Sequence, residues 1–225
     1  FTGDITLTDA FTQNEKLECV FNKLNDTGTF RSLMGEFAGE QTDFDLLLDV
    51  ADLERDFNIN DALATLNDNN GIGNNFEIII DSQNLDRLPI ELAVTLLHEA
   101  MHAEMRRFLF DTTATNSTVL PGFPDDITGD ITDDWRLFVE LNFDGRDPVG
   151  KAEHEVMANR YIPIIVKGLK EVFNNNNLTD DEYRALAWQG LSNTDIYRDA
   201  PPEFKTKIHE NTQPAKSKSS KTCKE

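Results

Sequence analysis

The sequence predicts an α+β domain in which a small β-sheet packs against two long helices. An apolar, largely β-branched run at 76–80 has the composition of a strand. Apolar residues then recur at helical spacing over about 88–110, and again over about 151–173. A strand signal combined with two long helical segments is the pattern of a domain of mixed class.

Shorter elements are expected before the strand at 76–80. A helix is predicted over 12–24 from the spacing of its apolar positions, Leu17, Val20, Phe21 and Leu24. A second short helix is predicted from Phe30 to Phe37. The segment from Phe44 to Leu53 is rich in Leu and Val and favours a strand, with a helix as the alternative. The run 67–75, mostly Asn, Asp and Gly, is expected to be a polar loop.

The long helix over 88–110 is predicted to begin near Pro89, since proline is tolerated in a first helical turn. Residues 111–150 are rich in Thr, Asp, Gly and Pro and contain one apolar island at 135–143. After the second long helix, Thr179 and Glu182 have the spacing of a capping box, which predicts a helix through Leu191.

The C-terminal composition divides the chain into two parts. From Gln213 onward, Lys, Ser and Thr predominate, which predicts a disordered tail over 213–225 and a single domain over 1–212. Because Phe1 is not a methionine, we expect a processed protein or an excised domain. Cys19 and Cys223 are compatible with a disulfide or with two free thiols, so the cysteines leave the redox compartment open.

Charge and hydropathy exclude two classes of function. The net charge of the 225 residues is −20, with 41 acidic and 21 basic side chains. So acidic a body would be repelled by phosphate backbones, which disfavours nucleic-acid binding. With 39% hydrophobic residues the chain can bury a core, but it has no apolar run long enough to predict a membrane span.

His98 and His102 indicate a metal site on the helix over 88–110. Four residues apart on a helix, the two imidazoles lie on one face and can bind one zinc ion. Glu99 lies between them, close to the metal without pointing at it, where it can take a proton from a zinc-bound water. The alternative is a pair of core histidines that bond to backbone carbonyls.

A third ligand is expected from the segment Glu153-His154-Glu155. At about 100° per residue, His154 falls in the middle of the apolar stripe of the second long helix, with Glu153 and Glu155 on its two margins. His154 is therefore the residue predicted to point into the core and to complete the site. Its alternative is a hydrogen-bonded core histidine.

The segment Leu96-Leu97-His98-Glu99-Ala100-Met101-His102-Ala103-Glu104 resembles the active-site helix of the zincin metallopeptidases, which carry an HExxH motif. In that family a β-sheet precedes this helix and its edge strand holds the substrate backbone, which implies that role for the strand at 76–80. The resemblance excludes the metzincin branch, because Met105 and Phe108 replace that branch's Gly and last His.

Two other zincin branches fit in different ways. In the gluzincins the third ligand is a Glu followed four residues later by an acid; Glu155 and Asn159 have this spacing, with Asn in place of Asp. A three-histidine site resembles the SprT-like branch instead, although that branch tends to be basic. We predict His154 as the third ligand. Glu155 and Asn159 are expected to be outer-sphere partners, with Glu155 as the alternative ligand. Tyr161 is a candidate for stabilising the oxyanion.

These residues imply a zinc endopeptidase, favoured over an exopeptidase, with a protein or peptide as substrate. The segment 186–194 also resembles zincin-like domains of bacterial secreted or modular proteins. A secreted protease or the toxin domain of a delivered effector is therefore expected rather than a cytoplasmic enzyme, with an inhibitor or a larger parent chain as further partners. The alternative function is a non-catalytic module in which zinc joins two helices, or an inactive metallopeptidase-like domain.

Overall fold

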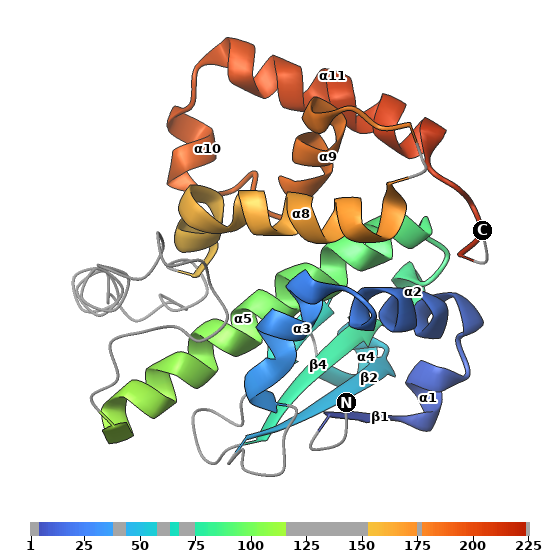
Figure 1. Ribbon diagram of the computed structural model, residues 1–225, viewed down its shortest axis with the longest axis vertical. Helices are drawn as coiled ribbons and strands as arrows, with labels where there is room; N and C mark the ends of the chain where they lie inside the picture. The colour runs from blue at the N-terminus through green and yellow to red at the C-terminus, as the bar shows by residue number, and fades with distance from the viewer. Residues whose placement is uncertain are drawn as a thin grey trace.

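Four strands form one sheet in the order β1-β2-β4-β3 (Figure 1). The computed structural model describes residues 5–37, 44–57, 64–67, 75–115, 153–174 and 177–223. The strands are β1 (Ile5–Leu7), β2 (Asp45–Ala51), β3 (Ala64–Asn67) and β4 (Asn75–Asp81). Strands β1, β2 and β4 run parallel, whereas β3 pairs antiparallel with β4. The predicted α+β class is confirmed at this level, because the described chain is mostly helical around one small sheet.

The expectation that 76–80 is the edge strand is wrong. Strand β4 pairs with β2 along one side and with β3 along the other, so it lies inside the sheet. Phe76, Ile78, Ile79 and Ile80 are all buried. A nearly continuous apolar run is typical of a strand covered on both faces, which places it centrally rather than at an edge. The edge strands are β1 and, beside β4, β3, whose last residue Asn67 was expected to begin a loop.

Helix α5 (Pro89–Thr115) is the central helix of the molecule and extends five residues beyond its predicted end. Every side chain from Ile90 to Met105 is buried. The helix contacts the sheet, α2 (Glu15–Asn25) and α3 (Gly28–Met34) on one side. On its other side it contacts α8 (Ile162–Phe173) and α9 (Asp180–Ala187) (Figure 1). A helix enclosed in this way has an apolar surface on more than one face, as its sequence does.

The remaining N-terminal elements are short. The predicted helix at 12–24 corresponds to α2, and the one at 30–37 to α3 followed by the 3₁₀ turn η1 (Gly35–Phe37). The segment 44–53 forms β2, as predicted. The structure adds α1 (Asp9–Thr12), α4 (Leu53–Phe57) and the 3₁₀ turn η3 (Ser82–Asn84).

The second long helix is interrupted by a π-helical turn. Residues 153–156 are α-helical, η5 (Met157–Tyr161) is π-helical, and α8 continues to Phe173. Pro163, in the first turn of α8, has no N–H to donate and its ring would collide with the carbonyl four residues earlier. Widening of the preceding turn accommodates it, and such π turns are frequent at functional sites. Residues 116–152, including the apolar island at 135–143, lie outside the described part of the chain.

The capping box that opens α9 is confirmed: the Thr179 hydroxyl accepts from Glu182 N–H, and the Glu182 carboxylate accepts from Thr179 N–H. The helix ends at Ala187, four residues before the predicted end. Gly190, with φ of 85°, lies in the turn that follows. Only Gly adopts such a left-handed backbone at little cost.

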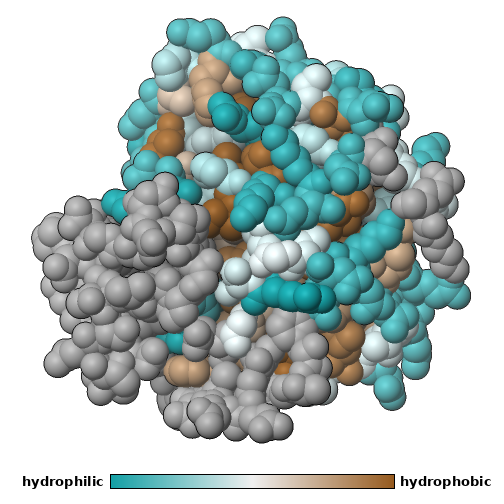
Figure 2. Space-filling view, viewed as in Figure 1, coloured by the Kyte–Doolittle hydropathy of each residue, from teal (hydrophilic) through white to brown (hydrophobic). Residues whose placement is uncertain are grey.

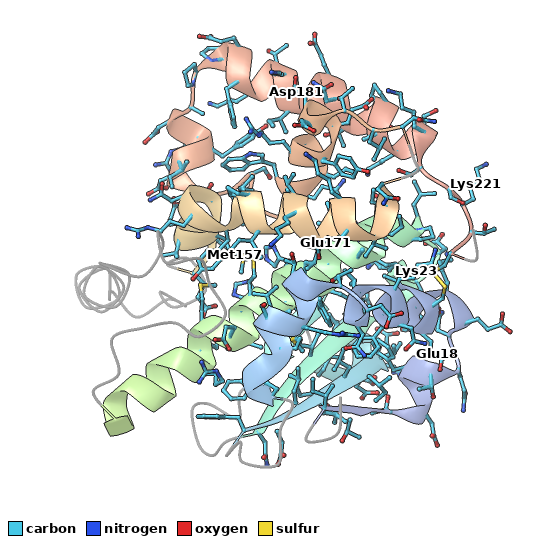
Figure 3. The ribbon with its side chains drawn as sticks, in the orientation of Figure 1. Glu18, Lys23, Met157, Glu171, Asp181 and Lys221 are labelled. Carbon is cyan, nitrogen blue, oxygen red and sulfur yellow. A yellow bond between two sulfur atoms is a disulfide. The ribbon has the colours of Figure 1, made fainter. Side chains whose placement is uncertain are left out.

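Residues 213–223 differ from the expected disordered tail. Helix α11 (Pro202–Lys218) follows α10 (Asp195–Asp199) and continues to Lys218, and Cys223 is bonded to Cys19 of α2 (Figure 3). Lysines of α11 pair with acidic residues of the body, with Nζ–O distances of 2.9 Å for Lys207–Asp181, 2.6 Å for Lys216–Glu91 and 2.7 Å for Lys218–Glu182. Composition alone predicted disorder because it contains no information about these distant partners.

The visible face of the described residues is mainly hydrophilic, with smaller apolar areas between (Figure 2). Ile196 is the one large hydrophobic residue among the described positions that is clearly exposed. Among the helices that the structure describes, none has the length and apolarity needed to cross a bilayer.

Candidate metal centre

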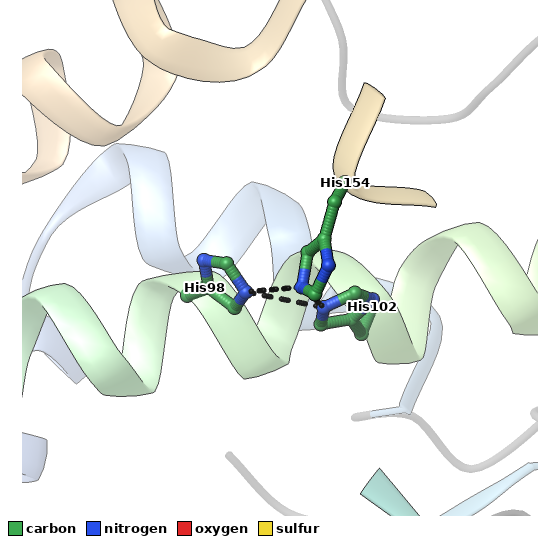
Figure 4. A group of neighbouring side chains, drawn as sticks. All are labelled: His98, His102 and His154. Atoms are coloured by element: carbon green, nitrogen blue, oxygen red, sulfur yellow. Dashed lines mark hydrogen bonds between the residues drawn. The ribbon is translucent and has the colours of Figure 1, made fainter. Parts of the chain in front are cut away.

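Three imidazoles converge on one point. His98 and His102 project from adjacent turns of α5, and His154 comes from the short helical segment before η5 (Figure 4). The Nε2 atoms of the three rings are 3.1 Å apart in each of the three pairs. His98 and His102 are buried, and His154 is half-buried.

Hydrogen bonding cannot account for this triangle. A neutral imidazole nitrogen is either a donor or an acceptor, so among three mutually close Nε2 atoms at least one pair must be donor–donor or acceptor–acceptor. Three lone pairs directed at a shared cation avoid that conflict. Tetrahedral ligand nitrogens about 2.0–2.1 Å from a zinc ion lie about 3.3 Å apart, close to the observed separation. The cluster therefore has a geometry that can hold a metal ion.

Glu153 fixes the tautomer of His102. Its Oε2 lies 2.7 Å from His102 Nδ1, so the carboxylate accepts the Nδ1 proton and leaves the Nε2 lone pair facing the cluster. Arg106 donates to the same carboxylate from Nε, over 2.8 Å to Oε1, and from Nη2, over 3.2 Å to Oε2. Glu153 has no exposed surface, and these charge-assisted bonds compensate for its burial.

His98 is held as a neutral ring. Burial, and then the neighbouring imidazoles of His102 and His154, keep the pKa of His98 well below its usual range. Gly190 lies against this ring, because a Cβ atom at position 190 would be 3.4 Å from His98 Cε1 and 3.8 Å from Nδ1. The turn after α9 therefore forms part of the wall of the cluster.

Glu99 is buried beside the first ligand of the cluster. Burial, and then the charge of Glu153, raise the pKa of Glu99 to about 8, while Arg106 opposes the rise. Glu99 is therefore coupled electrostatically to Glu153, which bonds His102, and to Arg106, which bonds Glu153. A divalent cation nearby would favour the ionised carboxylate.

Glu155, the alternative ligand expected from the gluzincin resemblance, is engaged elsewhere. Its carboxylate accepts from the backbone N–H groups of Asp195 and Ile196, the second over 3.2 Å, and so binds the first turn of α10. An acid at a helix N-terminus is favourable there. The cluster of donors that could share a metal contains His98, His102 and His154 and does not include Glu155, among the residues that the structure describes.

The other two candidates, Asn159 and Tyr161, differ in exposure. Asn159 lies on the π turn and is exposed, so the expected outer-sphere contact to an imidazole is not formed. Tyr161 is fully buried, and burial, followed by the charge of Glu104, raises its pKa. Tyr161 therefore lies in the core within electrostatic reach of Glu104, and its role toward an oxyanion stays a prediction.

Glu104 and Arg107 form a second buried ion pair on α5. Arg107 donates from Nε and Nη2 to the two carboxylate oxygens, each over 2.8 Å, and both side chains are 1% exposed. The Arg107 guanidinium also lies 5.7 Å from the centre of the Phe44 ring. The pair joins α5 to the residue before β2.

The sequence patterns did not indicate Glu153, Arg106 and Gly190 as parts of the site. Two signals were available: Glu153 directly precedes the predicted ligand, and Arg106 follows His102 by one helical turn. Comparison of the chain with family models, with curated proteins and with solved structures gave no match.

Proposed function

We propose that this protein is a zinc-dependent metallopeptidase of the zincin type that hydrolyses peptide bonds, with Glu99 as the general base and His98, His102 and His154 as ligands. The observation that carries the proposal is the 3.1 Å triangle of Nε2 atoms, two of whose members flank a glutamate on one helix.

The donor set fits zinc. Neutral imidazoles suit Zn, Cu, Fe and Ni, and three protein ligands with a fourth open position are typical of catalytic zinc sites. Structural zinc sites usually fill the fourth position with Cys or His. Here both cysteines of the chain are joined in the Cys19–Cys223 disulfide, so neither offers a thiolate. This favours catalysis over the alternative of a zinc-joined module without activity.

When bound, zinc would polarise a water molecule and the scissile carbonyl. Glu99 would accept a proton from that water and deliver it to the leaving amine, serving both halves of the reaction. Glu153 would hold His102 in its ligating tautomer, and Arg106 would hold Glu153. The burial of Glu99 strengthens its interaction with the reacting groups, because a low dielectric screens charge weakly.

The proposal implies a protein or peptide substrate, and the disulfide supports a location outside the reducing cytoplasm. Disulfides persist in oxidising environments, and the Cys19–Cys223 bond therefore supports a secreted protease or a delivered effector. The net charge of −20 gives no support to nucleic acid as a partner.

Metal analysis together with Glu99→Gln tests the proposal. The purified protein should contain about one zinc per chain, and the variant should keep both zinc and fold because Gln is nearly isosteric. Cleavage of a peptide library at matched zinc content should fall by about 10²–10⁴-fold in the variant. Equal cleavage by both proteins would exclude Glu99 as the base. Zinc binding without cleavage of any peptide by the wild type would favour the non-catalytic module.

A further inference from the structure

We infer that Glu153 and Arg106 are a positioning pair that sets the orientation of His102 and delivers His154 to the metal. The inference rests on the proposed metal site and concerns how that site is assembled. Neither residue is itself a proposed ligand. Glu153 acts by bonding His102 and by preceding His154 in the chain, and Arg106 acts by bonding Glu153.

The hydrogen bonds of Glu153 within the described part of the chain join it to α5. Its carboxylate accepts one bond from His102 Nδ1 and two from Arg106, and these two partners are one helical turn apart. The Arg106 guanidinium donates to both oxygens of the Glu153 carboxylate, and this bidentate geometry fixes the orientation of the carboxylate relative to α5. Because the carboxylate is fully buried, loss of either partner would leave a buried charge incompletely compensated.

Because Glu153 directly precedes His154, its bonds to α5 also position the third proposed ligand. His154 is the next residue, so pinning Glu153 against α5 also fixes the backbone that carries the third imidazole. On the other side, Glu155 binds the backbone N–H groups of Asp195 and Ile196 in α10. The segment Glu153-His154-Glu155 is thus anchored to two different helices through the carboxylates on either side of the ligand.

The test compares metal affinity in Glu153→Gln, Arg106→Lys and a matched control, Glu104→Gln. Glu104 lies on α5, as His102 and Arg106 do, and like Glu153 it is buried and paired with an arginine. Its carboxylate, however, bonds Arg107 rather than His102. Zinc affinity is measured by competition with a chelator, ligand geometry by the visible absorption spectrum of the Co²⁺-loaded protein, and folding by thermal melting.

Glu153→Gln should weaken zinc binding by about 10–100-fold and change the Co²⁺ spectrum, because outer-sphere partners of ligating histidines typically contribute this much. Arg106→Lys should also weaken zinc binding, but by less, because Lys keeps the positive charge and loses the bidentate hydrogen bonding of the guanidinium. Glu104→Gln should lower the melting temperature while its zinc affinity and Co²⁺ spectrum stay those of the wild type.

Equal zinc affinity in Glu153→Gln and wild type, with unchanged Co²⁺ spectra, would overturn the positioning role and leave the metal site intact. A wild-type protein that binds no metal would overturn the site and the pair together. If the wild type binds zinc and cleaves nothing, the proposed peptidase fails, and the affinities of the variants still decide the positioning role.

Discussion

Glu153 Oε2 lies 2.7 Å from His102 Nδ1, although 51 residues separate the two in the chain. The contact joins the helix that carries two of the three clustered histidines to the segment that carries the third. A carboxylate on the far nitrogen of an imidazole fixes its tautomer and raises its basicity as a ligand. Several consequences of this arrangement can be measured.

Metal removal should destabilise the fold, because an ion held by His98, His102 and His154 would link α5 to the segment before η5. At a free zinc concentration about 1,000 times the dissociation constant, the ion contributes about 4 kcal/mol to stability. For a chain of this size that corresponds to roughly 8–16 °C in melting temperature. Thermal melts with and without a chelator measure the shift.

Two variants serve as controls for the chelator experiment. His102→Ala should lose the shift, whereas Glu99→Gln should retain it because Glu99 is not a ligand. A chelator effect of the same size in His102→Ala would show that the ion binds elsewhere.

His154→Ala should reduce zinc affinity far more than Glu155→Ala. The first change would remove one of the three proposed ligands, whereas the second removes the carboxylate that accepts from the Asp195 and Ile196 N–H groups of α10. Isothermal titration of the metal-free proteins with zinc compares them. Retention of zinc by His154→Ala together with its loss in Glu155→Ala would instead indicate a gluzincin-like ligand set.

Gly190→Ala should destabilise the protein by about 1–2 kcal/mol, the usual cost of a left-handed backbone at a non-glycine residue. The φ of 85° is the cause, and the added methyl group would also contact His98. Urea denaturation measures the change. Gly28→Ala is the control, since a Cβ there meets nothing within 4 Å and the residue lies in a helix; this change should be neutral or stabilising. Equal free energies of unfolding for Gly190→Ala and Gly28→Ala would contradict the prediction.

Loss of the Cys19–Cys223 disulfide should cost about 2–5 kcal/mol, because the bond closes a loop of nearly the whole chain and limits the unfolded ensemble. Cys19→Ser, Cys223→Ser and the double variant should show the same loss in urea denaturation. Reductant should destabilise the wild type to the same level and leave the double variant unchanged. The lysine pairs of α11 should keep the variants folded, and an unchanged midpoint in all three would show that the bond contributes nothing.

The local elements followed closely from the sequence. The buried helix α5, strand β4 and the capping box of α9 each depend on side chains within one or two turns, and the corresponding patterns predicted all three. The 3.6-residue period of a helix alone places His98 and His102 on one face. The apolar stripe of the second long helix indicated His154 as the residue that joins the other two histidines, and the structure brings the three together. It did not predict the burial order, because His154 is half-buried whereas Glu153 and Glu155 are buried.

Elements that depend on distant partners were not predictable in the same way. Strand β3 has only four residues, and its pairing with β4 places it at one edge of the sheet. The basic C-terminal segment from Gln213 has the composition of a disordered tail, yet it is helical to Lys218, and its Lys216 and Lys218 pair with Glu91 and Glu182.

The sequence by itself therefore determined the α+β class, the buried helix and the face on which its histidines lie, because these depend on periodicity and local sterics. Tertiary structure alone decided which carboxylate orients His102, which carboxylate caps α10, and that Cys19 meets Cys223. Glu153 and Glu155 have the same side chain and lie on opposite margins of the apolar stripe. Only the packing of α5 on one side and α10 on the other gives them different partners.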